Sequence, residues 1–502
     1  MAALDNHILT ILEPTIKLDE VQFPSYGEGE GNERANTSKD YIVLVTVNNY
    51  TFSDENIKSM SLNVSGKIPS LQLVLEDSKG LFKADTYPRD GDVVNIRIGA
   101  RQKETYKDIR IDFDIIEVTS PKANPQNPES TAGAKYTFTG RMKIPGIYAD
   151  ISKSYGKGSS LDHIESIATD LKLGLATNID SSDDDMNLFI AYDSIDDVLG
   201  DLVKHSYVND DSFQTYSIDP FYYINYVNMN LLMESEETFE DALAALDVSM
   251  TDQQTSVDAE DSNNMKTPLV LSTHNRYTGT SNHITKFALT NNAGSNIEKN
   301  GYKQTLKFYE NDSEEGLVSF DVEPVTSKKM KDIEEPMKGR RDEDRYKNEV
   351  KTKWMGRKNA DPETSNIHLN YEFAAIHNAQ NLDELGKMTL EIELSTYNPA
   401  IHRYQKIPII IFKERPEEIG ADKVIKDKKK EQGFDVDTDT GEEEIPQAGT
   451  VVADEFLSGY YVVGGIDYIY KAGFPAVAQK LTLLRREWPS RINNINEGTV
   501  SS

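Results

Sequence analysis

The feature that most constrains the fold of this chain is a period-two alternation of apolar and polar residues, which is most regular in its C-terminal part. The residues that share one side of two successive runs are Ile466, Tyr468 and Tyr470 in the first, and Leu481 and Leu483 in the second. Such spacing in segments rich in Tyr, Val and Ile is typical of half-buried strands. Residues 471–478 between the runs carry a glycine and a proline, which predict a loop. The alternation therefore predicts a β-hairpin.

Similar short runs follow one another between residues 41 and 150. They lie at 41–47, 61–64, 71–75, 92–98, 109–113 and 136–140. Several short strands at this spacing are typical of an antiparallel β-barrel or sandwich. We therefore expect a first barrel over residues 41–150, preceded by an N-terminal arm over residues 1–40.

The apolar period changes from two to that of a helix after residue 150. Ser159 and Ser194 each precede an acidic residue by three positions, as in a capping box, and an apolar helical stripe follows each of them. Residues 221–227 have strand character, and residues 238–246 predict a third helix. We expect residues 151–255 to form a mixed α+β domain.

A second strand-rich region begins after a polar linker. Its predicted strands are residues 269–271, 285–290, 305–308, 318–322, 389–394 and 406–412, with a helix at 373–388. We expect a second barrel over residues 256–415, with a charged insertion at 327–360 and a charged flexible loop at 416–450. The hairpin within residues 451–490 closes this barrel, and residues 491–502 form a tail. The predicted fold class is therefore mainly β with α+β: two antiparallel β-barrels plus a mixed α+β domain.

Composition excludes several classes of function. The net charge of −30 opposes binding to a phosphate backbone, so a nucleic-acid-binding role is not expected. The absence of cysteine excludes disulfides, thiolate zinc sites and cysteine nucleophiles. Residues 1–5 lack the basic start of an export signal, and the longest aliphatic run, Ile407–Phe412, is too short to span a bilayer. We expect neither export by that route nor membrane insertion.

No motif predicts a catalytic, cofactor-binding or metal-binding residue. The acidic run from Asp435 resembles a calcium loop, but Thr440 and Pro446 stand where the loop needs Gly and Glu. The histidines are scattered, and His368 and His377 are nine residues apart. The glycines of residues 156–160 touch a predicted helix start, which leaves an anion site as an alternative to a turn.

The exit of the C-terminal hairpin carries the best candidates for contact with another chain. Exposed aromatic and arginine side chains are enriched where proteins associate. The candidates are Tyr460, Tyr461, Arg485, Arg486, Glu487 and Trp488. For the two tyrosines core packing is an equal alternative, and Trp488 has the alternative of plugging the end of the barrel.

The order of these regions resembles the central hub proteins of phage contractile-tail baseplates. This family is similar to the late-control D proteins and to the N-terminal part of type VI secretion spike proteins. The segments that carry the resemblance are residues 87–94, 159–173, 192–213, 398–410 and 459–488. The resemblance implies two tube-protein-like barrels per chain and a homotrimer whose six barrels form a ring. Such a ring adapts the threefold spike below to the sixfold tail tube, or its initiator proteins, above.

The resemblance also implies a place and a set of partners. The protein is expected in the virion, in the tail baseplate, after assembly in the cytoplasm of the host bacterium. DNA or the tape-measure protein passes through the ring without specific binding, and the acidic charge suits that role. The two charged insertions are longer than a minimal hub needs and are expected to contact other baseplate proteins. Few residues follow Trp488, so the spike is expected to be a separate protein.

Three other functions stay open on the sequence alone. The chain can be a distal-tail or tail-associated protein of a non-contractile phage, because such proteins share barrels of this kind. A tail-borne peptidoglycan hydrolase would need a pair of carboxylates in a cleft. A carbohydrate-binding sandwich would need exposed tryptophans, and only Trp354 and Trp488 exist.

Overall fold

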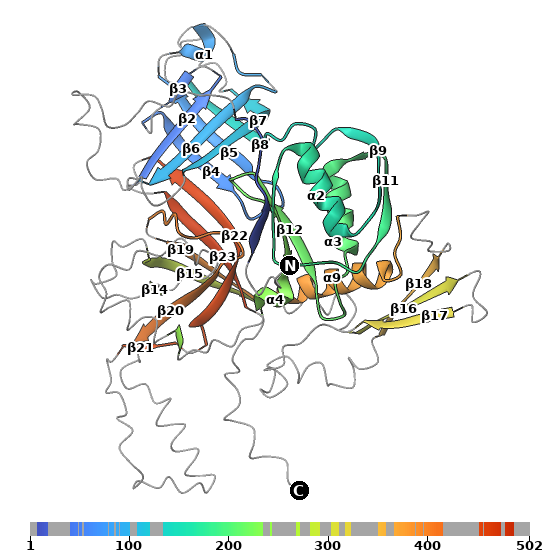
Figure 1. The fold of residues 1–502 in the computed structure, drawn as a ribbon. Helices are drawn as coiled ribbons and strands as arrows, with labels where there is room; N and C mark the ends of the chain where they lie inside the picture. Colours follow the sequence, from blue (N-terminus) through green and yellow to red (C-terminus); the bar gives the residue numbers. More distant parts are fainter. Residues whose placement is uncertain are drawn as a thin grey trace, which may run out of the picture.

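The structure is a computed structural model of the chain, and it confirms the predicted class, mainly β with α+β (Figure 1). It describes residues 8–18, most of 41–233, 241–242, 268–271, 282–291, 303–310, 317–322, 350–357, most of 366–414 and most of 451–485. Apart from residues 241–242, the predicted helix at 238–246 lies outside the described residues, as do the calcium-like run and most of both charged insertions. The division into domains remains a prediction.

Most strands belong to one large sheet of 14 strands. Its N-terminal part contains β2 (Tyr41–Val47), β3 (Tyr50–Phe52), β4 (Ile57–Asn63), β5 (Ser70–Asp77), β6 (Val93–Ala100), β7 (Ile109–Thr119) and β8 (Ala134–Met142), with the short helix α1 (Leu81–Ala84). The order is β4-β5-β8-β7-β6-β2-β3, with antiparallel pairing throughout. Alternate residues of β5 are buried, as the period-two pattern predicts.

The C-terminal part of the same sheet is built from strands far apart in the sequence. It contains β14 (Leu269–Leu271), β15 (Ile284–Asn291), β19 (Met388–Leu394), β20 (Lys406–Glu414), β21 (Val451–Ala453), β22 (Gly459–Lys471) and β23 (Ala478–Leu484). β22 and β23 form the hairpin expected from the alternation. The residues expected on its inner side, among them Tyr468 and Leu481, are buried.

One long strand, β22, joins the two parts of the sheet. Its first residues pair with β20, and its last residues, Asp467–Lys471, pair antiparallel with β4. β23 lies along the other side of its middle. The hairpin was expected to close a second barrel, whereas in the structure it also continues the sheet into the N-terminal part, as Figure 1 shows at the centre of the molecule.

A smaller α/β unit lies beside the sheet (Figure 1). It contains β9 (Asp150–Gly158), α2 (Ser160–Leu171), β10 (Gly174–Thr177), β11 (Met186–Ser194), α3 (Ile195–His205), β12 (Gln214–Ile218), β13 (Tyr223–Asn228) and α4 (Met229–Met233). Ser159 caps α2 in a complete capping box, and Ser194 caps α3, both as predicted. The strand β1 (Leu9–Leu12), from the expected arm, pairs with β10 and so belongs to this unit.

Two further elements differ from the expected second barrel. β16 (Lys303–Glu310), β17 (Leu317–Val322) and β18 (Val350–Arg357) form a separate three-stranded sheet. β18 falls within the segment expected to be an exposed charged insertion, because its two lysines and one arginine belong to the charged run on which that expectation rested. The predicted helix at 373–388 is present as α9 (Tyr371–Leu385), but it packs against α3 of the α/β unit. Among the described residues no helix is both long and apolar enough to cross a membrane.

Candidate interaction surfaces

The turn between β4 and β5 is the point where three parts of the molecule meet. The Arg403 guanidinium donates to the Val64 carbonyl at 2.9 Å, and the Ile218 amide donates to the Lys67 carbonyl at 2.7 Å. Arg403 precedes β20 in the C-terminal part of the sheet, and Ile218 ends β12 in the α/β unit. Hydrogen bonds to backbone groups from both sides hold this turn in one geometry. The three parts are therefore fixed relative to one another.

The side chains predicted for contact at the hairpin exit are placed differently from one another. Tyr461 is 1% exposed, its hydroxyl donates to the Leu457 carbonyl at 2.6 Å, and burial raises its pKa to about 12. The Arg485 guanidinium lies 5.4 Å from the Tyr461 ring centroid and donates to the Ser458 carbonyl at 3.1 Å. Tyr460 is half-buried against a small apolar cluster. These three side chains are engaged within the chain itself.

The other three predicted contact residues, Arg486, Glu487 and Trp488, lie outside the described residues. A role for the set in binding another chain therefore remains a prediction. One signal in the sequence bears on the pair of tyrosines: neighbouring residues of a strand point to opposite faces. Tyr460 and Tyr461 therefore do not present their rings to a single partner surface.

The glycine-containing segment before α2 is the end of strand β9, and not the turn that was the alternative to an anion site. Gly156 has a φ of 77°, in the left-handed region that favours glycine. The Ser160 amide at the start of α2 donates to the Asp184 carboxylate at 2.9 Å, and the Ser159 amide donates to Asp162 at 2.9 Å. These amides already donate to carboxylates of the chain itself. They are therefore not available to bind an anion from solution.

The outer edge of the large sheet exposes apolar side chains. β15 pairs with β19 and is the last strand of the sheet's order among the described residues, and a single bridge between Val270 and His283 brings its start next to β14. Its Phe287 and Leu289 are exposed, although their partners across the ladder, Ile392 and Leu390, are buried. The apolar face of the sheet thus extends to an edge where it meets solvent in the described part of the chain, which is a geometry suited to association.

A second candidate surface, missed by the sequence analysis, lies where α9 meets the α/β unit. The Asn378 amide nitrogen donates to the carbonyls of Val203, Lys204 and Ser206, at 3.2, 3.0 and 3.0 Å, at the C-terminal end of α3. Its side-chain oxygen accepts from the Gln214 amide at 3.3 Å. One buried asparagine therefore satisfies carbonyls that a helix end leaves without partners. Nothing in the local sequence around Asn378 signals this contact.

Just before α9, Asn366 joins the edge of β11. The Phe189 amide donates to the Asn366 side-chain oxygen at 2.8 Å, and the Asn366 nitrogen donates to the Phe189 carbonyl at 2.8 Å. The asparagine side chain thus occupies the two backbone groups that a neighbouring strand would use. His368 is close by, buried, with Nε2 2.8 Å from the His205 carbonyl. Residues 366–378 are therefore held tightly on the α/β unit.

A pocket of about 320 Å³ lies between β11, the outer side of α3 and this segment. Its lining combines an aliphatic floor with three aspartates: Met186, Leu188, Phe189, Ile190, Asp193, Asp197, Val198, Asp201, Leu202, Asn366 and Tyr371. Asp201 lies 3.2 Å from His205 Nδ1, and this hydrogen bond lowers the pKa of the Asp201 carboxyl. Tyr371 stacks on the His205 ring at 3.7 Å and donates to Asp201 at 3.1 Å.

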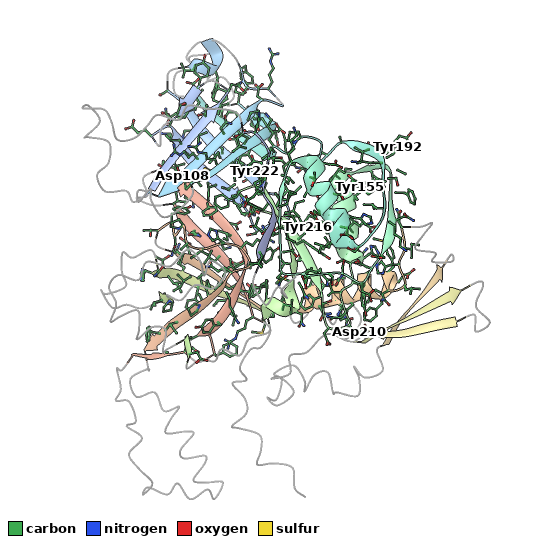
Figure 2. All side chains as sticks on the ribbon, viewed as in Figure 1. Asp108, Tyr155, Tyr192, Asp210, Tyr216 and Tyr222 are labelled. Atoms are coloured by element: carbon green, nitrogen blue, oxygen red, sulfur yellow. The ribbon has the colours of Figure 1, made fainter. Side chains whose placement is uncertain are left out.

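The pocket combines an apolar floor with acidic groups. Within the residues that the structure describes, no group of three His, Asp or Glu side chains is placed to hold a metal ion. Figure 2 shows Tyr192, on the same strand as five of the lining residues, at the outer margin of the unit, whereas Tyr216 and Tyr222 lie nearer the large sheet. An aliphatic floor with carboxylates at its rim suits an apolar group that carries a positive charge.

Comparisons with known proteins give the following findings. No known protein family and no curated protein matches the sequence. Among solved structures, the chain is similar to a 43 kDa tail protein of prophage MuSo2 from Shewanella oneidensis, with a TM-score of 0.47 and 9% identity over 89% of this chain and 98% of that one. It is similar to a tail protein from Neisseria meningitidis MC58, with a TM-score of 0.44 and 10% identity over 89% and 96%. It is also similar to an E. coli component of the type VI secretion system, with a TM-score of 0.39 and 6% identity over 88% and 78%. At these TM-scores the comparison does not assign the chain to a family.

Proposed function

We propose that this chain is a structural hub subunit of a phage contractile-tail baseplate, with no catalytic role of its own. Three copies form a ring that joins a threefold spike to a sixfold tail tube and surrounds the path of the DNA. The observation that carries the proposal is the strand β22, which pairs with β20 at one end and with β4 at the other. One chain thereby holds two β-rich parts in a fixed relation, and three chains hold six.

A symmetry adaptor needs the two β-rich parts of each chain to keep one distance and orientation relative to each other. If the two β-rich parts of one chain were joined by a flexible linker, their positions in a ring would vary. Here the turn between β4 and β5 also binds Arg403 and Ile218, so each part is held by hydrogen bonds as well as by the sheet. The exposed apolar edge at β15 supplies a surface for a neighbouring subunit.

The charge of the chain supports the proposed passage of DNA. A net charge of −30 per chain repels a phosphate backbone, so DNA slides through a ring of such chains without binding to it. The same charge opposes self-association through the acidic surfaces. Contacts between copies therefore have to use apolar or basic surfaces.

The solution mass of the purified chain tests the proposal. Light scattering is expected to give three times 56.4 kDa, for the chain alone or on addition of the virion's candidate spike protein. Replacing Phe287 and Leu289 with glutamate is expected to lower that mass, whereas the same change at exposed Tyr87 and Ile116 leaves it unchanged. Replacing Arg486 and Trp488 together with alanine tests the predicted contact at the hairpin exit in the same assay.

Two results would overturn the proposal. One is a folded monomer both with and without the spike protein, which removes the ring. The other is release of soluble fragments from purified peptidoglycan by the chain, which would place it among tail-borne hydrolases. A trimer whose particles show six-fold features in electron micrographs separates the hub from a distal-tail protein that forms a different ring.

A further inference from the structure

The pocket beside β11 lies among exposed apolar side chains. Phe189, at its rim, is 47% exposed, and Leu369, two residues before the pocket's Tyr371, is 66% exposed. Tyr192, further along β11, is 83% exposed. Large apolar side chains that gather at the mouth of a cavity mark binding surfaces more often than isolated ones do.

Two of the three carboxylates of the pocket, Asp193 and Asp197, have no ion pair with a basic residue in the described part of the chain. Asp197 accepts from the Ser194 hydroxyl at 2.7 Å, and Asp201 accepts from Tyr371 at 3.1 Å. Within the described part of the chain, no lysine or arginine forms an ion pair with either residue or with Asp193. His205 lies beside Asp201, and the charge of Lys204 also acts on that carboxylate. The pocket therefore carries an excess of negative charge that a cationic group from outside can balance.

The edge of β11 away from β9 is capped at Phe189 by a side chain of the chain itself. β11 pairs with β9 on one side, and among the described strands it has no strand on the other. On that free side the Asn366 side chain already makes both backbone hydrogen bonds of Phe189, as the peptide group of an added strand would. A segment that docks here therefore uses the pocket beside Asn366 through its side chains, because Phe189 has no backbone group left for it.

The pocket is also preformed. Asn378 fixes α9 to the end of α3, and the stacked rings of Tyr371 and His205 fix the start of α9 over the pocket. A rigid site loses less conformational entropy on binding than a mobile one does. The observed cavity is thus a property of the folded unit.

We propose that this pocket binds an extended segment of another protein, in which a lysine or arginine stands beside an apolar residue. The apolar side chain fills the aliphatic floor, and the cationic group lies at the rim beside Asp193 and Asp197. Charge complementarity selects another protein over a second copy, because each further copy brings a net charge of −30. The proposal does not depend on the ring or on its role in a tail.

A short labelled peptide in which lysine alternates with leucine is the probe, and fluorescence anisotropy with the full chain is the readout. The pocket variant carries Asp193→Asn and Asp197→Asn. Its matched control carries Asp180→Asn and Asp185→Asn, two exposed aspartates of the same unit that lie outside the pocket. Both variants change the net charge equally, so a long-range attraction to the acidic chain affects them equally. We expect the pocket variant to weaken binding about tenfold and the control less than about twofold.

Two further variants distinguish a loss of binding in the pocket from a loss of folding. Asp193→Asn alone removes a carboxylate that holds no hydrogen bond within the described residues, so it leaves the unit folded by circular dichroism. Leu369→Ser is expected to weaken binding of the lysine–leucine peptide but not of a peptide in which serine replaces leucine. Equal weakening by the pocket variant and its control, or the absence of binding to the unmodified chain, overturns the proposal. Self-association of the chain that competes with the peptide and is lost in the pocket variant also overturns it, because the occupant is then a second copy.

Discussion

At the scale of single residues, the most unusual conformations belong to tyrosines. Tyr192 and Tyr222 have φ values of 59° and 68°, in the left-handed region that bulky residues rarely adopt. Tyr192 stands at an irregularity of β11, between Ala191 and Asp193, with its side chain exposed. Tyr222 is buried, and its hydroxyl accepts from the Asp112 amide at 3.0 Å. The same backbone strain is therefore offset by packing at Tyr222 but not at Tyr192.

Replacing these two tyrosines with asparagine is expected to change stability in opposite directions. Asparagine tolerates the left-handed region, so Tyr192→Asn is expected to raise the free energy of unfolding by about 0.5–1 kcal/mol. Tyr222→Asn relieves the same strain but leaves a cavity in the core, so it is expected to lower the free energy of unfolding by about 3 kcal/mol. Urea unfolding followed by circular dichroism measures both. A loss of stability in Tyr192→Asn would show that this tyrosine packs more tightly than its exposure indicates.

Some residue-scale features are readable from the sequence, and these two tyrosines show why others are not. Ser159 and Ser194 were predicted as caps because a cap needs only a serine and the residues that follow it. The buried side of β22 follows from alternation alone. The conformation of Tyr222 depends on a partner 110 residues earlier in the chain, which no local pattern encodes.

At the scale of elements, β22 shows how a strand is shaped by what it touches. Its register with β23 shifts between Val463 and Gly465, where two glycines are adjacent in the strand. A Cβ atom added at Gly465 would lie 2.5 Å from the Ser65 hydroxyl and 2.7 Å from its Cβ. Glycine is needed here because the turn after β4 passes directly over the strand. The shift lets β22 run from the partner β20 to the partner β4.

Replacing Gly465 with alanine is expected to lower the free energy of unfolding by about 2 kcal/mol, because the new methyl group overlaps with Ser65. Adding Ser65→Gly should recover at least half of that loss, since it removes the overlapping atoms at the cost of one hydrogen bond to Asp467. The free energies of unfolding of both single variants and of the double variant, measured by chemical denaturation, give a double-mutant cycle. Simple additivity of the two single changes would contradict the close approach.

The pairing of elements was harder to predict than the elements themselves. The hairpin, α2, α3, α9 and most strands follow from periodicity, because each is decided by neighbouring residues. The sheet of β16, β17 and β18 was not separated from the barrel, since a strand's own residues do not specify its partner. The pocket beside β11 was missed for the same reason: it is lined by two segments about 170 residues apart, joined by Asn366 and Phe189.

At the scale of the whole molecule, buried tyrosines lie both in the α/β unit and in the large sheet. Tyr226 lies in the α/β unit, and Tyr461 and Tyr468 lie on β22. Burial raises the pKa of each hydroxyl, to about 12 for Tyr461. A tyrosine whose pKa is raised in the folded state favours folding below the pKa of the unfolded chain. That contribution is lost as the pH rises toward the folded value.

We therefore expect the chain to unfold cooperatively in alkali, with stability falling from about pH 10 upward. Tyrosinate absorbance and far-ultraviolet circular dichroism, recorded in one titration, test this. The buried tyrosines should ionise only as the circular dichroism signal is lost, so the two curves share their final step. Complete ionisation near pH 10 with a native spectrum would contradict the burial of these rings.

The strand β22, which joins the two parts of the sheet, is synthesised long after its partner β4. The hydrogen bond from Ser65 to Asp467 joins residues that are 402 positions apart in the sequence. After β4 has been synthesised, a stretch of about this length must follow before its partner strand β22 exists. At ribosomal rates of about 5–20 residues per second, that interval is about 20–80 s. During this time the nascent chain presents the open edge of β4, where another polypeptide can add as a strand. Occupation of that edge by a chaperone during translation would keep polysomes that make this protein from aggregating.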